Sequence, residues 1–219
     1  METTRKHKVP EMEGRQARWY AKNRGTEAQL KQYRRQAAEV VAGLAAGAEI
    51  LEVAPGPGFF AIELAKLGFR VTGLDISHTM VEIALEEAAR AGMAVDFRQG
   101  DVTTAPFADE SFDLLVCQAA FKNFRQPVTA LNEMHRVLRP GGFAVIHDLN
   151  HQATGADIQR EVDSMDVGVL NGFTVRQTLG WLRRRAFTPA QFEELATESE
   201  FAGCSVTQAG IGLEVRLTR

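Results

Sequence analysis

A glycine-rich turn separates a short apolar run from a helical pattern near residue 55. The apolar run contains Glu52, and the turn that follows contains Ala54, Gly56 and Gly58. Glycines let the backbone approach a ligand closely, and the helix that follows directs its free N–H groups at the polar part of that ligand. A dinucleotide fingerprint would need glycine where Ala54 and Phe59 stand. The turn therefore does not favour a cofactor that contains a pyrophosphate.

Two further carboxylates follow the next two apolar runs. Asp75 lies 19 residues after Gly56, the offset at which a carboxylate accepts both hydroxyls of a ribose. Its alternative role is to cap the next helix, for which Ser77 is an equally good residue. Asp101, after the third run, can accept a hydrogen bond from an adenine amino group, or it is an ordinary loop acid.

The combined charge of these three segments limits the choice of cofactor more strongly than any single motif does. Glu52, Asp75 and Asp101 are all acidic, and their three loops contain no Lys or Arg. Such a pocket repels a pyrophosphate but attracts a cofactor with a sulfonium cation and an ammonium group. The sequence therefore predicts S-adenosylmethionine (SAM) as the cofactor, with S-adenosylhomocysteine (SAH) as its product.

Alternating strand and helix patterns are expected to position these residues. The predicted strands are 50–53, 70–74, 95–98, 112–117 and 143–147, and the predicted helices between them are 59–67, 78–91 and 127–138. This alternation predicts an α/β fold with a Rossmann-like, doubly wound sheet. Helices are then expected at 156–165, 175–185 and 189–197, followed by a hairpin of strands 205–208 and 213–217.

The first 46 residues contain two further helical patterns, a short one around Trp19 and Tyr20 and a longer one over 26–46. The predicted organisation is an N-terminal helical cap (1–46), a SAM-binding core (47–149), a helical lid facing the acceptor (150–188), and a C-terminal helix with a hairpin that completes the sheet (189–219).

Composition limits the classes of partner. The 219 residues carry a net charge of −3, although residues 1–35 alone carry ten Lys or Arg against four Glu. This basic segment either forms a solvated helix face or attracts an anionic partner. The negative net charge disfavours a nucleic-acid partner, although RNA stays an alternative. The sequence contains no apolar run long enough to span a membrane. Its two cysteines favour a reducing, cytoplasmic location without a metal cluster. The oligomeric state, a homodimer included, stays open.

Residues 50–149 resemble the class I SAM-dependent methyltransferases, specifically the small-molecule group called methyltransferase domain type 11. The segments that carry the resemblance follow one another in the order and spacing of the family: 50–58, 71–80, 100–102, 106–113 and 136–142. The resemblance implies a seven-stranded sheet whose last strand is antiparallel, in agreement with the predicted hairpin.

The resemblance also implies roles for individual residues. The turn at Ala54, Gly56 and Gly58 would pack against the methionine part of SAM, and Gln118 would face the same part. Glu52 would reach its amino group and Asp75 would hold the ribose. Ile76 and Met80 would border the adenine, and Asp101 with Val102 would read its edge. Ala54 replaces the usual first glycine of the family, which is tolerable if its φ is negative.

Methyl transfer requires alignment and exclusion of water, and a general base only for a weakly acidic acceptor. Tyr20, His147 and His151 are the main candidates for that base, and Lys122, Asn123 and Asp148 lie on the same predicted rim. Arg176 and residues 183–185 in the lid favour a small, partly apolar acceptor with anionic or phenolic character. The alternatives are an enzyme that uses SAM without methyl transfer, for example in a cyclisation, and a non-catalytic SAM-binding module.

Overall fold

Seven strands form one sheet in the order β3-β2-β1-β4-β5-β7-β6 in the computed structural model, which describes residues 12–164 and 169–219. Strands β1 to β5 run parallel, whereas β7 is antiparallel to both β5 and β6. The strands are β1 (Glu49–Val53), β2 (Arg70–Asp75), β3 (Asp96–Gln99), β4 (Phe112–Gln118), β5 (Leu138–Leu149), β6 (Ser205–Ala209) and β7 (Gly212–Thr218). The predicted Rossmann-like sheet, its antiparallel last strand and the hairpin are confirmed.

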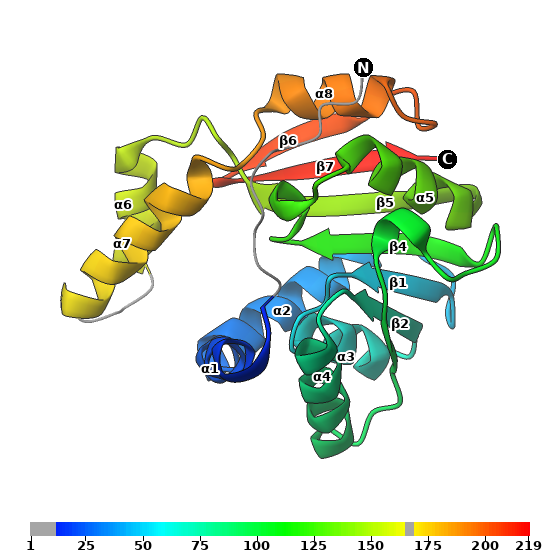
Figure 1. Cartoon of the computed structure of the whole chain (residues 1–219), viewed down its shortest axis with the longest axis horizontal. Helices are drawn as coiled ribbons and strands as arrows, with labels where there is room; N and C mark the ends of the chain where they lie inside the picture. Colours follow the sequence, from blue (N-terminus) through cyan, green and yellow to red (C-terminus); the bar gives the residue numbers. More distant parts are fainter. Residues whose placement is uncertain (1–11, 165–168) are drawn as a thin grey trace.

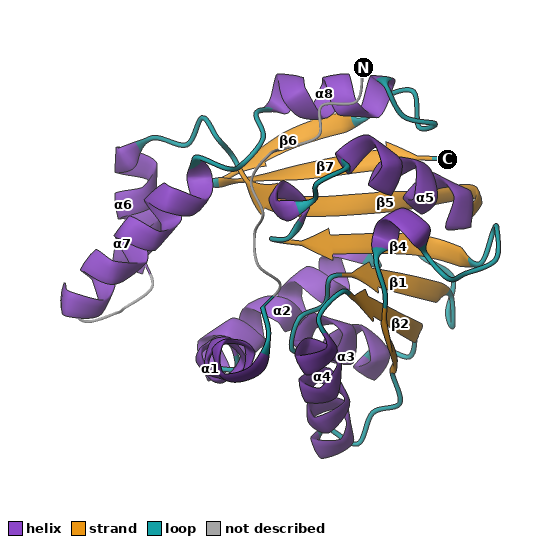
Figure 2. Cartoon of the chain, viewed as in Figure 1, coloured by secondary structure: helices purple, strands orange, loops and turns teal. Residues whose placement is uncertain are grey.

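Helices cover both faces of the sheet (Figure 1 and Figure 2). They are α1 (Gly14–Arg24), α2 (Glu27–Val40), α3 (Phe59–Lys66), α4 (His78–Arg90), α5 (Pro127–Val137), α6 (Gly155–Ser164), α7 (Val169–Arg183) and α8 (Pro189–Thr197), with short 3₁₀ turns η1 (Val102–Thr104) and η2 (Phe121–Asn123). One apolar cluster joins α5 and α8 to the sheet, and a second joins α2, α3 and α4 to the opposite face. Residues 114–117 of β4 are fully buried between them, as their continuous apolar run predicts.

Three predicted elements differ from the structure by about five residues or more at one end. Helix α2 ends at Val40 rather than at residue 46, because the chain turns at Gly43 with a φ of 84°. Strand β5 begins at Leu138 rather than at residue 143, because Leu138 pairs with Phe112 and the Arg219 backbone extends the ladder at Gly142. Helix α7 spans 169–183 rather than 175–185.

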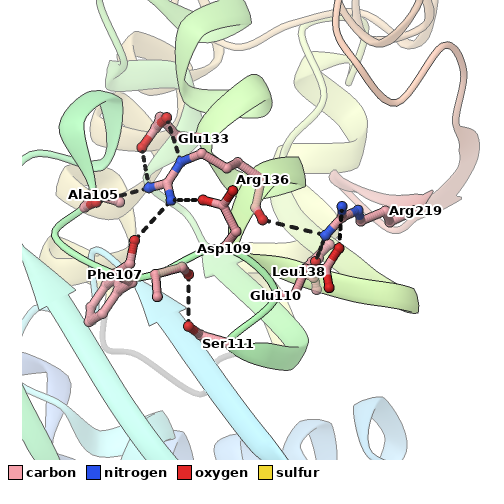
Figure 3. Close-up of polar contacts among 10 residues, drawn as sticks. Ala105, Phe107, Asp109, Glu110, Ser111, Glu133, Arg136, Leu138 and Arg219 are labelled. Carbon is pink, nitrogen blue, oxygen red and sulfur yellow. Dashed lines mark hydrogen bonds and ion pairs between the residues drawn. The ribbon is translucent and has the colours of Figure 1, made fainter.

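The family-like segments 106–113 and 136–142 are tied together by Arg136 (Figure 3). Its guanidinium donates to the carbonyls of Ala105 and Phe107 at 3.0 and 2.9 Å and pairs with Asp109 and Glu133 at 2.7 and 2.8 Å. These bonds fasten α5 to the connection between β3 and β4. Arg136 therefore has a structural role in these segments, on the face of the sheet that α5 covers.

Two helical segments flank the edge at which the parallel strands end. Figure 1 shows α1 on one side of this edge and the α6–α7 pair on the other. Among the described residues, no helix is both long and apolar enough to cross a bilayer.

Candidate functional site

The glycine-rich turn between β1 and α3 adopts left-handed backbone conformations. The φ angles of Ala54, Gly56 and Gly58 are 57°, 54° and 78°. A Cβ on Gly58 would lie 2.6 Å from the Phe97 ring and 2.9 Å from the Cβ of Ala84, so space as well as φ requires glycine there. The condition under which alanine would be tolerated at position 54, a negative φ, is therefore not met. A left-handed non-glycine residue costs about 1–2 kcal/mol, so the turn is strained where the family has glycine.

Glu52 ends up almost completely buried beside this turn. Its side chain is 2% exposed, and its Oε2 atom has no hydrogen-bond partner among residues 12–164 and 169–219. Burial raises the pKa of Glu52 to about 8, with a smaller contribution from Asp75 in the same direction, while the Ala61 amide opposes the shift. A buried acid of this kind is poised to receive a hydrogen-bonding cation.

Asp75 stabilises the turn directly. Its two carboxylate oxygens accept hydrogen bonds from the amides of Gly56 and Ser77, both at 2.9 Å. Burial is the main cause that raises the pKa of Asp75, and these amides oppose it. Ser77 rather than Asp75 caps α4, because its hydroxyl accepts from the Met80 amide at 3.0 Å. The carboxylate oxygens have further lone pairs, and the predicted contact of Asp75 with a ribose stays a prediction.

The four residues expected near the adenine follow the neighbouring strands β2 and β3. Ile76 is 44% exposed, and Asp101 is also exposed and caps η1 by accepting from the Thr103 amide at 2.9 Å. Met80 and Val102 are buried, with Met80 packed beneath α1. The four residues thus lie just beyond two neighbouring strands, and only Ile76 and Asp101 among them are exposed to solvent.

A polar row continues across the ends of the central strands. Gln118 of β4 pairs in register with His147 of β5, which pairs with Glu214 of β7. His147 Nε2 lies 3.0 Å from Glu214 Oε2. Within the described part of the chain, His147 Nδ1 and Gln118 Nε2 are buried without hydrogen-bond partners. With Nε2 donating to Glu214, Nδ1 is the nitrogen that can accept a proton.

A cavity of about 60 Å³ separates the N-terminal helices from this part of the sheet. Tyr20 and Arg24 of α1, Tyr33 of α2, Glu52 and Gln118 all line it. Arg24 Cζ lies 5.6 Å from the centre of the Tyr20 ring. Tyr20, predicted as a base near the acceptor, is therefore grouped with the residues expected at the methionine end.

Sequence reasoning missed three residues of the site: Arg24, Tyr33 and Glu214. One signal was available for Arg24, because residues four apart on a helix lie on the same face and Tyr20 precedes it by that spacing. The positions of Tyr33 and Glu214 depend on how α2 docks and how β7 pairs, which no local pattern shows.

A larger cavity, of about 360 Å³, lies between α1, α2, α3 and α4. Its lining is helical and includes Lys22, Glu63 and Arg90. Size would favour this cavity, but the buried polar atoms of Glu52 and Gln118 line the smaller one. We therefore assign the site to the smaller cavity at the strand ends.

The remaining base candidates are placed differently from His147. Lys122 and Asp148 form an ion pair at 2.9 Å and are 4% and 7% exposed. Asp148 also accepts from the Lys122 amide at 2.8 Å, so the pair fixes η2 against the end of β5. Asn123 and His151 are exposed, and the His151 amide donates to the Phe187 carbonyl at 3.1 Å.

The donor and acceptor atoms at the cavity fit the amino-acid end of SAM. Glu52 offers an unpaired carboxylate oxygen to an ammonium group, and Gln118 offers an unpaired amide N–H within the described chain. The glycine turn brings backbone amides to the same place, and Gly58 has no room for a side chain. The residues present therefore match a zwitterionic ligand better than an anionic one.

Comparisons with known proteins agree with this chemistry. Residues 51–146 match the methyltransferase domain family. A demethylmenaquinone methyltransferase of Renibacterium salmoninarum is 35% identical over 127 residues, which cover 58% of this chain and 52% of that protein. A ubiquinone biosynthesis O-methyltransferase of a Methylobacterium species is 30% identical over 74% of this chain and 61% of its own length. This chain spans about half the length of the curated relatives it matches.

Among solved structures, a SAM-dependent methyltransferase described as putative, from Methanococcus maripaludis, superposes with a TM-score of 0.73. It is 21% identical, and the match covers 98% of this chain and 97% of that one. This likeness shows the fold. Together with the methyltransferase domain match over residues 51–146, it confirms the resemblance of the sequence to the class I SAM-dependent methyltransferases.

Proposed function

We propose that this chain transfers the methyl group of SAM to a small aromatic acceptor with a phenolic or quinol hydroxyl. The main observation in favour of SAM as the cofactor is a pair of buried atoms that lack hydrogen-bond partners in the part of the chain that the structure describes. They are Oε2 of Glu52 and Nε2 of Gln118. When bound, SAM supplies a methyl group on a positively charged sulfur, which is a good leaving group. The chain must then hold the acceptor in line and keep water out.

Two observations support an aromatic acceptor. The relatives from Renibacterium and Methylobacterium carry names that concern menaquinone and ubiquinone. In addition, Phe173 and Trp181 of α7 are 59% and 55% exposed, and Arg176 and Arg185 lie 5.7 and 5.0 Å from the centres of their rings. Exposed aromatic and guanidinium groups suit a flat, electron-rich ring with anionic character.

His147 is the base that this proposal favours. The hydroxyl proton of the acceptor would pass to Nδ1 of His147, while Glu214 holds Nε2–H and stabilises the imidazolium. Neither Tyr20, grouped with Arg24, nor Lys122, paired with Asp148, has a comparable arrangement. His151, exposed on the surface, is the weaker second candidate for the base.

The test is incubation of the protein with SAM and a 2-alkyl-1,4-naphthoquinol or a dihydroxybenzoate, followed by mass spectrometry. A methylated product with one equivalent of SAH is the expected result, and NMR would show whether carbon or oxygen is methylated. Conversion of an acceptor without SAH would instead indicate the non-methylating enzyme. SAM binding with no conversion of either acceptor class, or of RNA, would indicate a binding module.

The His147→Gln variant tests the base. We expect kcat to fall about 10²–10⁴-fold while SAH affinity is unchanged. Glu214→Gln should lower kcat less, because it leaves the imidazole in place and removes only the carboxylate that orients it. An unchanged kcat in His147→Gln would remove His147 from the mechanism. A cytoplasmic location and the absence of a nucleic-acid partner remain predictions, and the oligomeric state, a homodimer included, stays open.

A further inference from the structure

We propose that Arg24 of the N-terminal cap binds the carboxylate of the methionine part of the cofactor. Helix α1 would thus complete a cofactor site that the matched domain, residues 51–146, leaves without a cation. This inference rests on the proposed SAM site, but not on the identity of the acceptor.

The charge requirement comes first. The amino-acid end of SAM carries an ammonium and a carboxylate, and the strand-end segments offer the carboxylates of Glu52 and Asp75 and the neutral Gln118. A ligand carboxylate placed there without a cation would be repelled by both acids. Arg24 lines the same cavity as Glu52 and Gln118, although it belongs to a segment 28 residues before Glu52. It supplies the missing charge.

The guanidinium of Arg24 also lacks a bonding partner at one position. Its Nε atom is buried, and no acceptor bonds to it among the residues that the structure describes. Glu52 Oε2 and Gln118 Nε2, on the opposite wall, have the same property. Leaving such atoms unpaired is costly unless a ligand satisfies them. The three atoms together form a donor, an acceptor and a donor around one small space, which is the complement of an amino-acid group.

Tyr33 lies close to both Arg24 and Glu52 in this space. Burial is the main cause that raises the pKa of the Tyr33 phenol; Arg24 opposes the rise and Glu52 adds to it. The phenol is therefore within electrostatic range of both side chains. On the other side, the Tyr20 ring lies 5.6 Å from Arg24 Cζ and orients the guanidinium by stacking.

Packing fixes the end of α1 over the glycine turn. Gly25, directly after Arg24, approaches the first residue of α3 so closely that a Cβ would lie 2.9 Å from the Phe59 ring. Thr26 then caps α2, with its hydroxyl accepting from the Gln29 amide at 3.4 Å. The position of Arg24 is thus set by close backbone approach rather than by a flexible surface helix.

The beginning of α1 is held just as firmly. Glu13 accepts hydrogen bonds from the amides of His78 and Thr79 at 2.9 and 3.1 Å, at the first turn of α4. Ala17 and Ala21 pack on Met80 and Ile83 of the same helix. The cap is therefore docked on the core independently of Arg24, so a change at Arg24 need not undock it.

The test compares ligands that differ in one charge. Affinities of wild-type protein, Arg24→Met and Arg24→Lys are measured by calorimetry for SAH and for decarboxylated SAH, which keeps the ammonium and lacks the carboxylate. Arg15→Met, a loss of an exposed charge on the same helix, is the matched control. Arg24→Met should weaken SAH binding by about 10- to 100-fold and change binding of the decarboxylated ligand less than about twofold. Arg24→Lys should retain part of the discrimination, because lysine keeps the charge but not the planar fork.

Equal losses for both ligands would overturn the inference, because Arg24 would then act by holding the cap. No loss for either ligand would overturn it as well. If Arg24→Met does not fold, the inference is tested with Arg24→Lys and with the wild-type protein. The wild-type protein should bind SAH more tightly than decarboxylated SAH, and a ratio of the two affinities near one contradicts the inference. SAH binding without methylation of any acceptor would instead defeat the proposed function and leave this site standing.

Discussion

Binding of SAH should release close to one proton from Glu52 near pH 7. The side chain is 2% exposed, and burial raises its pKa to about 8. An ammonium group bound to Oε2 would favour the carboxylate and bring this pKa back toward or below its ordinary value of 4.5. The carboxyl is protonated before binding and ionised after it, so the proton must leave to the buffer.

The magnitude follows from the pKa of the ligand-free protein. With a pKa of about 8, roughly 0.9 of the Glu52 side chains are protonated at pH 7 and roughly 0.1 at pH 9. The free amino group of SAH is already protonated at pH 7 and contributes little there. The number of protons that Glu52 releases per SAH bound should therefore be about 0.9 at pH 7 and about 0.1 at pH 9. At pH 9 the net release is lower still, because the amino group of SAH takes up a proton there to bind as an ammonium.

Calorimetry in buffers of different ionisation enthalpy measures this number directly. Glu52→Gln should abolish the release, whereas the control Glu63→Gln should leave it unchanged. Glu63 is also buried, at 5% exposed, but it is paired with Lys66 at 2.7 Å and with Arg34 at 3.4 Å. Release of less than about 0.3 proton by the wild-type protein at pH 7, or equal release by Glu52→Gln, would refute the assignment of Glu52 to the ammonium group.

Stability without ligand should show the same titration. The folded pKa of Glu52 lies above its unfolded value of 4.5, so its contribution to stability is fully present below pH 4.5 and is lost as pH rises to about 8. Relative to Glu52→Gln, the wild-type protein should therefore lose about 2 kcal/mol between pH 6 and pH 8. Urea denaturation at both pH values checks this, and a constant difference between the two proteins would contradict it.

Three further substitutions test the supports of the site, each by urea denaturation. Arg136→Met should lower the free energy of unfolding by about 2–3 kcal/mol, because it removes charge-assisted hydrogen bonds between α5 and the β3–β4 connection. A loss below about 0.5 kcal/mol would show that these bonds contribute no more than exposed ion pairs do. Gly58→Ala should cost about 2–4 kcal/mol and remove SAH binding, because the new methyl group meets Phe97 at positive φ; retained binding would contradict the close approach. Lys122→Met should cost about 3–5 kcal/mol by leaving Asp148 buried without its cation, and adding Asp148→Leu should restore much of it; no recovery would contradict that cause.

The part of the site that local patterns determine could be predicted from the sequence. Each of Glu52, Asp75 and Asp101 stands at or just beyond the end of an apolar run, and the ends of parallel strands meet at one edge of a sheet. The same patterns predict the turn at Gly56 and Gly58, where the chain needs positive φ. Even here the pattern did not predict the strain at Ala54, because φ at that position follows from the tight connection of β1 to α3.

The part that depends on docking could not be predicted. Glu214 meets His147 only because β7 inserts antiparallel between β5 and β6, and a shift of one residue in that register would turn Glu214 to the other face. Arg24 reaches Glu52 only because the α1–α2 junction packs on Phe59. The sequence showed a basic N-terminal segment, but composition cannot tell that Arg24, among its ten cations, lines the cavity.

The polar row gives the site a direction along the sheet. Glu52, Gln118, His147 and Glu214 occupy β1, β4, β5 and β7, which are consecutive neighbours in the sheet. Strands lie about 4.8 Å apart, so His147 is displaced from Glu52 by roughly 10 Å across the strands. If Arg24 and Glu52 hold the amino-acid end of the cofactor, the proton-accepting end of the row lies on the side of α6 and α7 rather than of α1 (Figure 1). The N-terminal helices would then contribute to cofactor binding, and the α6–α7 pair would contribute to acceptor binding. Related proteins could therefore keep the same cofactor site while their acceptor sites differ.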